Sequence, residues 1–325
     1  MNLIVSLRRK LNIFFDDTKR SNYRLKLNFI KNSLFGNDID ESAIETSKLR
    51  LWLSLIIDED NYEKIKTLPN LDFKITFGDS LTVIEKNLFN NEKLKELDAL
   101  KNVFFSQSNS KIKNKIKNEI LTRFADLFNK DSFFDIEIIY NEVFEKKGGF
   151  DIIVSNPPYF QIQKIKDKIY KKKLKENFKV FDSFGDLYCL FIERSLNLLN
   201  SNGVVSLITS NKWLKTSYGD KLRNYFLSKN NLLQLIDFKK TPIFKSADVD
   251  TSIVLCSKEK KNSDEIKCSL FNTIIKHNDL ENFINSNSIN ITFSYNDPWT
   301  IADKKSLKLL EKLSKIQNKL DFKKL

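Results

Sequence analysis

The sequence predicts an α/β protein built on a doubly wound sheet, and three observations support this fold class. Segments rich in β-branched residues alternate along the chain with segments of helical periodicity, as in folds whose helices cover both faces of a sheet. The run Phe150–Ser155 is apolar and β-branched, which is typical of a buried, interior parallel strand. A chain of 325 residues is also long enough for an α/β core and part of a second domain.

The first half of the chain predicts the start of this sheet and a helical insertion. Residues 1–32 are basic and precede the core, which we assign to residues 33–260. Residues 84–149 are highly charged and predict helices, paired as a hairpin, that leave the core and return to it. The elements expected before this insertion are a strand at Ser33–Asp38, a helix at Glu41–Ile57 and a strand at Asp72–Phe77.

The second half predicts the remaining strands and their helices. The very basic Gln161–Lys179 is expected to form a mobile loop beside the site. Residues 261–325 read as a linker, rich in Asn and Ser at Asn282–Asn296, followed by a helix at Asp303–Leu320. The other expected elements are helices at Gly185–Leu199 and Tyr218–Leu227 and strands at Gly203–Thr209, Leu232–Phe238 and Thr251–Ser257.

Composition limits the classes of function. The net charge of +13 suits a polyanionic partner, although the codon usage of an AT-rich genome would explain the lysines equally well. His277 is the single histidine and the three cysteines are scattered, so we expect neither a metal site nor a Ser-His-Asp triad. No apolar run reaches membrane-spanning length, and Met1–Arg20 does not resemble a signal peptide. We therefore expect a cytoplasmic protein without a membrane partner.

The most informative motif is Asn156-Pro157-Pro158-Tyr159, directly after the strand at Phe150–Ser155. The prolines restrict the backbone, so an amide, a carbonyl and an aromatic ring are held where α/β sheets bind ligands. The oxygens of Asn156 and Pro157 could accept both N–H groups of an adenine amine and aim its lone pair at a methyl donor. Tyr159 could stack on a base that has left the duplex. The alternative is an ordinary Pro-Pro turn.

With this motif, two further segments resemble a known family. They are Phe35–Ile44 and Lys48–Leu53, and the resemblance extends from about Leu34 to about Val254. Together they resemble adenine-N6 DNA methyltransferases of the Eco57I-like restriction–modification type. The resemblance implies a Rossmann-like methyltransferase sheet, S-adenosylmethionine as cofactor, and double-stranded DNA with a flipped adenine as substrate, within a restriction–modification or related defence system.

The resemblance also implies roles for individual residues. Asp38 would accept the ribose hydroxyls of the cofactor, and Ile39 would pack on its adenine. Asp40 could replace Asp38, but we favour a helix-capping role for it. Asp79 would accept the amine of the cofactor's adenine, or else it is a turn aspartate. Phe244 would stack on the flipped base together with Tyr159, or else it belongs to the core.

One feature of the family is absent. The seven glycines include no Gly-x-Gly pair, and such a pair forms the loop that holds the methionine part of the cofactor in this family. We therefore expect a fragment that lacks the first strand and the Gly-rich loop, with a truncated target-recognition region beginning in residues 261–325. A polypeptide encoded upstream could supply the loop.

Two other functions remain open at this point. An inactive subunit could bind DNA or a partner chain without catalysis. An amino-methyltransferase acting on protein glutamine or RNA guanine could use the same tetrapeptide, although such enzymes are usually compact and lack a long insertion. The DNA target sequence is not predictable, because base-edge contacts determine it.

Overall fold

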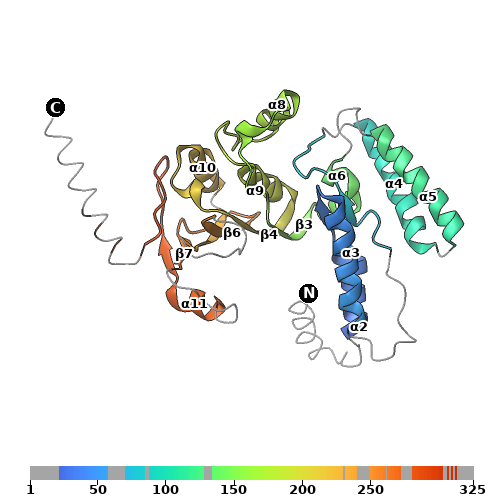
Figure 1. The fold of residues 1–325 in the computed structure, drawn as a ribbon, viewed down its shortest axis with the longest axis horizontal. Helices are drawn as coiled ribbons and strands as arrows, with labels where there is room; N and C mark the ends of the chain where they lie inside the picture. The colour runs from blue at the N-terminus through green and yellow to red at the C-terminus, as the bar shows by residue number, and fades with distance from the viewer. Residues whose placement is uncertain are drawn as a thin grey trace. The chain divides into compact units, whose positions relative to one another are not determined.

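A computed structural model provides the structure of the protein (Figure 1). The chain divides into two compact units, Met1–Glu142 and Val143–Leu325, and each is described by itself. The structure describes residues 22–57, 70–84, 88–107, 109–127, 134–229, 231–239, 249–260, 262–271 and 280–302, with residues 306, 309 and 312.

The first unit contains a two-stranded parallel sheet with helices. Strand β1 pairs with β2, so that Gly36 lies opposite Ile75. Apolar side chains of the two helices that flank β1 are buried with Ile75 in one core cluster. The elements are α2 (Asn22–Ser33), β1 (Gly36–Asp38), α3 (Glu41–Ile56), β2 (Ile75–Phe77), α4 (Leu88–Ser106), α5 (Ser110–Leu127) and α6 (Ile136–Ile139), and α7 (Asn141–Lys147) lies at the division.

The insertion contains the expected helical hairpin. Helices α4 and α5 pack against each other, and the Arg123 guanidinium of α5 forms ion pairs with Glu96 of α4 and Glu119 of its own helix. Phe104 is buried and its ring meets that of Phe73 edge to face. The predicted pairing of helices in this segment is therefore confirmed.

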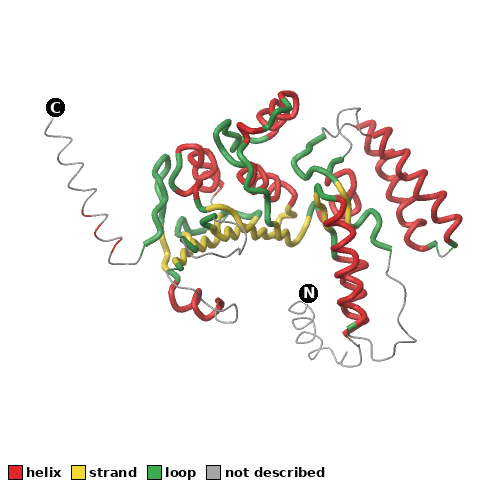
Figure 2. Tube along the Cα trace, viewed as in Figure 1, coloured by secondary structure: helices red, strands yellow, loops and turns green. Residues whose placement is uncertain are grey.

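The second unit contains a mixed sheet, whose strands are yellow in Figure 2. Its six strands follow the order β3-β4-β6-β5-β7-β8. Strands β3 and β4 pair in parallel, as do β5 and β7, and the other neighbours are antiparallel. The elements are β3 (Phe150–Ser155), α8 (Lys168–Asn177), α9 (Leu187–Leu198), β4 (Leu199–Ser210), α10 (Asp220–Lys229), β5 (Leu232–Asp237), β6 (Thr251–Ser257), β7 (Ile266–Leu270), α11 (Leu280–Asn287) and β8 (Ile289–Ile291), with short 3-10 turns at Ile162–Lys164, Lys212–Leu214 and Ser217–Gly219.

Helices cover both faces of this sheet, as the α/β class requires. Figure 1 shows α9 and α10 on one side of the strands and α11 on the other. Helix α9 buries Leu190 and Ile192, and β4 buries Val205. Cys189, Cys256 and Cys268 are buried, which confirms their interpretation as small core residues. The predicted fold class is therefore confirmed. None of the helices in the described ranges is long and apolar enough to cross a membrane.

Strand β3 is not the buried interior strand that its sequence predicts. It is the terminal strand of its sheet, and within the described ranges it pairs with β4 alone. Ile152 and Val154 are 67% and 78% exposed. The prediction was wrong because an apolar run indicates the environment that a strand suits, whereas its neighbours in the sheet are set by the rest of the chain.

Two further expectations about loops were wrong. Gln161–Lys179 contains a 3-10 turn and helix α8, in which Asp167 caps the N-terminus and Leu174 is buried. Asn282–Asn296, expected as a linker, contains the end of α11 and strand β8, which pairs with β7. In both segments a few buried apolar residues outweigh a polar composition, since packing overrides local propensity. The helix expected at Asp303–Leu320 lies almost entirely outside the described residues.

Candidate functional site

The turn Asn156–Tyr159 follows β3 at its carboxyl end in the second unit. Strand β3 is fixed by parallel pairing with β4, in which Ile153 lies opposite Val205. Before β3, Gly149 has a φ of 144° and lies so close to the start of β4 that a Cβ atom would stand 2.5 Å from the Leu198 carbonyl oxygen. Glycine is therefore required where the two strands come together.

Asn156 presents its amide to solvent. The residue is exposed, whereas the adjacent Pro157 is buried. In the described part of the chain the Asn156 side chain has no hydrogen-bond partner. The two proline rings hold the backbone of the turn without using the amide. Both its oxygen and its nitrogen are thus available to a ligand.

Tyr159 is the last residue of the same turn, and two contacts hold its side chain in place. Its hydroxyl donates to the Ile208 carbonyl oxygen over 3.4 Å, and its ring meets the Tyr188 ring edge to face with centroids 6.1 Å apart. Burial raises the pKa of the Tyr159 phenol. The phenol therefore stays protonated near neutral pH, and the side chain offers a neutral aromatic surface.

A polar network of Tyr188, Tyr218 and Asp186 lies behind Tyr159, and the part that Tyr218 plays in it was not predicted from the sequence. The Tyr188 and Tyr218 hydroxyls lie 2.8 Å apart, and Tyr218 donates to the Asp186 carboxylate over 3.0 Å. Burial raises the pKa of Tyr188, so this hydroxyl remains a hydrogen-bond donor. Tyr218 lies far from Tyr159 in sequence and belongs to no motif, so its position gave no signal. The network supports the Tyr159 ring from behind.

In the first unit, Asp38 ends β1 and begins a turn. Its Oδ1 accepts the backbone N–H of Asp40 at 3.0 Å. The Asp40 carboxylate in turn accepts the backbone N–H of Ser42 at 2.8 Å and caps α3. The hydrogen bond from the Ser42 side chain lowers the pKa of Asp40. The capping role predicted for Asp40 is confirmed, and Ile39 between the two carboxylates is 69% exposed.

The Asp79 turn lies beside the Asp38 turn in the same unit. The Gly78 backbone N–H donates to the Asp38 carbonyl oxygen at 2.9 Å, and Asn37 links the two turns by donating to the Gly78 carbonyl oxygen at 2.8 Å. The Asp79 carboxylate accepts the Leu81 backbone N–H at 2.9 Å, as a turn aspartate does. Asn37 is a linking residue that sequence analysis did not identify.

The predicted site residues therefore fall into two sets. Asp38, Ile39 and Asp79 are brought together in the first unit, and Asn156–Tyr159 form one turn in the second. Phe244 lies outside the described residues. The roles of both sets stay predictions.

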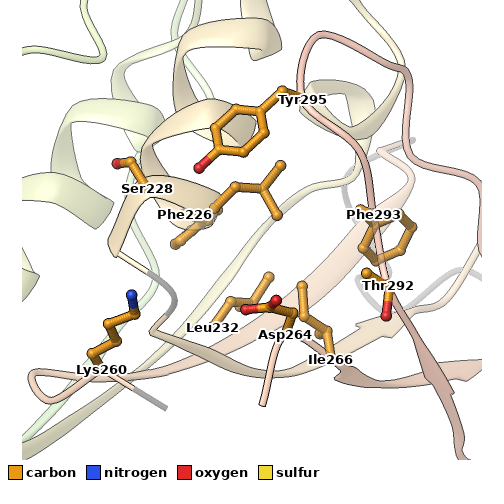
Figure 3. Close-up of a pocket in the computed structure, with 10 residues that line it drawn as sticks. Phe226, Ser228, Leu232, Lys260, Asp264, Ile266, Thr292, Phe293 and Tyr295 are labelled. Carbon is orange, nitrogen blue, oxygen red and sulfur yellow. The ribbon is translucent and has the colours of Figure 1, made fainter. Parts of the chain in front are cut away.

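A pocket of about 260 Å³ in the second unit contains none of these residues (Figure 3). It is lined by apolar and polar side chains of α10, β5, β7 and the segment after β8, together with Lys260 and Asp264. It is therefore separate from the turn at Asn156.

Comparison with solved structures shows which proteins share this fold. The Type ISP restriction-modification enzyme LlaGI, in a nuclease-deletion form with a DNA substrate mimic, aligns with a TM-score of 0.54 and 15% identity over 94% of this chain and 24% of its own. LlaBIII, an ATP-dependent Type ISP enzyme bound to DNA, aligns with a TM-score of 0.55 and 16% identity over 93% of this chain and 20% of its own. The chain thus has a fold found in restriction–modification enzymes.

The family follows from the sequence comparison. The model of the Eco57I restriction-modification methylase family matches residues 32–244, and the chain belongs to this family, as its resemblance predicted. The Type II methyltransferase M.BstVI of Geobacillus stearothermophilus is 27% identical over 50% of this chain. RM.Eco57I of Escherichia coli, a Type II restriction enzyme and methyltransferase, is 26% identical over 78% of it. The chain covers 32% and 22% of these two relatives.

Proposed function

We propose that the chain carries the catalytic core of an S-adenosylmethionine-dependent DNA methyltransferase that modifies the N6 amine of adenine, within a restriction–modification or related defence system. The observation that carries the proposal is the Asn156–Tyr159 turn. There, at the end of a strand, an amide with no partner among the described residues lies together with a supported aromatic ring. Membership of the chain in the Eco57I restriction-modification methylase family supports the proposed methylation of DNA.

The residues of the second unit would position the amine. The side-chain oxygen of Asn156 and the backbone oxygen of Pro157 each accept one N–H bond of the adenine amine. Withdrawal of the nitrogen lone pair into the ring is thereby reduced, and the pair is aimed at the methyl carbon. Bound S-adenosylmethionine would supply the methyl group to this nitrogen, and the electrons of the broken carbon–sulfur bond would remain on its sulfur. One N–H proton then leaves to water. Tyr159 stacks on the base and keeps it extrahelical.

The first unit offers part of a cofactor site. The second oxygen of Asp38 remains available to ribose hydroxyls while its Oδ1 holds the turn, and Ile39 presents apolar surface to an adenine ring. These residues fit the nucleoside part of S-adenosylmethionine, which supplies a methyl group on a positively charged sulfur. Asp79 would bind the amine of the cofactor's adenine.

A second polypeptide segment would complete the methionine end of the site. The sequence has no Gly-x-Gly pair, and β3 has an edge that is unpaired among the described residues and carries exposed Ile152 and Val154. Such an edge suits another strand. Calorimetry with S-adenosylmethionine, for the chain alone and with the polypeptide encoded upstream, tests this. Binding by the chain alone would contradict the need for a partner.

To test the reaction, the chain is incubated with methyl-labelled S-adenosylmethionine and with genomic DNA, RNA or protein. The upstream polypeptide is added if the chain does not bind the cofactor without it. Label in DNA, recovered as N6-methyladenine, is the expected result. Label in protein glutamine or RNA guanine would replace the proposal with the corresponding activity. Cofactor binding without transfer to any of the three would favour a non-catalytic subunit.

A further inference from the structure

The segment Gln161–Asp186 leaves the sheet directly after Tyr159 and returns to the same point. Its two ends are tied together, since the Leu187 backbone N–H donates to the Phe160 carbonyl oxygen and that of Ile162 to the Gly185 carbonyl oxygen, each at 2.9 Å. We call this segment the arm. Any ligand bound by the arm is thereby held in a fixed relation to the Asn156–Tyr159 turn.

The arm is a packed element. Ile162, Leu174 and Phe178 are almost completely buried, and the Glu193 carboxylate accepts the Val180 backbone N–H at 3.0 Å. The Lys221 ammonium group donates to the Phe181 carbonyl oxygen at 2.6 Å. In Figure 1, α8 lies on the same side of the sheet as α9 and projects from the rest of its unit. The arm therefore presents its outer surface with a defined geometry.

That outer surface is basic. Lys168, Lys172 and Lys175 of α8 are exposed, and their spacing of four and three residues puts them on one face of the helix. We call these three residues the lysine face. Lys172 forms an ion pair with Glu176 at 3.7 Å between largely exposed side chains, a weak interaction that a stronger anion can displace. Lys164 and Lys166 before the helix are exposed too.

A row of surface lysines is often only a solvated helix face, and two observations favour a binding role here. Phe160 and Phe184 stand at the root of the arm and are 42% and 73% exposed. Exposed aromatic rings and exposed lysines on one element are typical of proteins that contact both bases and phosphates. The lysine face spans about 10 Å along the helix, a length that covers roughly three phosphates along one DNA strand.

We infer that the arm is a DNA-binding element and that its lysine face holds the backbone phosphates next to the target nucleotide. The inference rests on the proposed function and extends it by naming the surface that positions the duplex. Phosphate contacts of this kind fix register and orientation without reading sequence. The arm thus orients DNA, and the adjoining turn acts on the base.

The test compares two triple variants of the full chain with equal loss of charge. One is Lys168→Gln, Lys172→Gln and Lys175→Gln in the lysine face. The matched control is Lys93→Gln, Lys111→Gln and Lys115→Gln, which changes three exposed lysines of the α4–α5 hairpin. The probe is a fluorescent duplex of mixed sequence, and anisotropy is measured over a series of salt concentrations. Melting temperatures show whether both variants remain folded.

For the lysine-face variant, the slope of log affinity against log salt should fall by about 2.7, because each lost phosphate contact removes about 0.9. Affinity near 0.1 M salt should fall more than tenfold, while the control stays within about threefold of wild type. Replacing the same three lysines by arginine should preserve binding. Equal losses in both glutamine variants, or an unchanged slope in the first, would overturn the inference.

Different results would contradict the role of the arm and the proposed function. If the wild-type chain binds the duplex and the lysine-face variant binds equally well, the inference about the arm is wrong and the proposed function stands. If the wild-type chain, with or without the upstream polypeptide, neither binds nor methylates DNA, the proposed function is wrong and the inference falls with it.

Discussion

Two turns at the ends of parallel-paired strands carry the predicted site, and they are built in opposite ways. The turn after β1 is held by its own carboxylates, since Asp38 accepts from Asp40 and Asp40 accepts from Ser42. The turn after β3 is held by Pro157 and Pro158, and its Asn156 amide has no partner within the described ranges. Proline rings stiffen the turn after β3, so the Asn156 amide can use its hydrogen-bonding groups on a ligand. In the turn after β1, the carboxylates use part of their hydrogen-bonding capacity to hold the turn itself.

The comparison predicts its largest effect at Asn156. Asn156→Ala should lower the rate of methyl transfer by about 100-fold to 1,000-fold, the loss seen when a single preorganised transition-state contact is removed. Cofactor affinity and melting temperature should be unchanged because prolines hold the turn. Label transfer to DNA, calorimetry and thermal melting provide the three readouts.

Asn114→Ala is the matched control, since Asn114 is an exposed asparagine in α5. Turnover at the wild-type rate in Asn156→Ala would remove the amide from the mechanism. A large fall in melting temperature would show that the amide supports the turn, and the contrast between the two turns would be lost.

Truncation of Asp38 to alanine should weaken cofactor binding and also destabilise the turn after β1. Asp38→Ala should weaken S-adenosylmethionine binding about tenfold to 100-fold, because charge-assisted hydrogen bonds to ribose hydroxyls are lost. Its melting temperature should fall as well, since the acceptor for the Asp40 N–H is removed. Calorimetry is done with the upstream polypeptide present if the chain alone does not bind.

Asp38→Asn separates the two roles. The amide oxygen can still accept the Asp40 N–H, so the fold should be retained, but one side-chain acceptor is lost and affinity should still fall. An Asp38→Asn variant with wild-type affinity would indicate that ribose is bound elsewhere.

The parts of the site that depend on neighbouring residues could be predicted from the sequence. The prolines after β3 and the capping of α3 by Asp40 are local effects, so a short stretch of sequence is enough to predict them. The helical periodicity of the insertion is local too, and its hairpin was predicted.

Other features depend on contacts between distant residues. The hydroxyl pair Tyr188 and Tyr218 results from the packing of segments far apart in the chain. The place of β3 at the end of its sheet, among the described strands, likewise depends on segments distant from it in sequence. The helix in the arm was missed because its lysines obscured the one buried leucine, Leu174, that anchors it. The hydrophobic pattern of a segment shows which of its faces is suited to burial. Whether that face is buried depends on tertiary contacts with distant segments.

Tyr159 tests whether the second turn acts through its ring or its hydroxyl. The hydroxyl makes one long hydrogen bond, 3.4 Å to the Ile208 carbonyl oxygen, so Tyr159→Phe should change kcat/KM for DNA by less than about threefold. Tyr159→Ala should lower it about tenfold, because stacking on the base is lost. Burial raises the pKa of Tyr159, so the Phe variant should show the wild-type pH profile. Equal losses in both variants would assign the role to the hydroxyl.

The smallest effect is expected at Asp40, whose carboxylate serves the first turn and α3. Asp40→Ala should lower the melting temperature by a few degrees, since an N-cap is lost, and Asp40→Asn should restore most of it. Hydrogen bonds from Ser42 hold the pKa of Asp40 below its usual value. The contribution of the charged cap is therefore complete at neutral pH and is lost as the pH falls through the depressed folded-state pKa. Melting curves of wild type and Asp40→Asn should accordingly converge in acid. Curves that stay equally far apart at every pH would show that the charge of Asp40 contributes nothing to the cap, and that the first turn depends on its geometry alone.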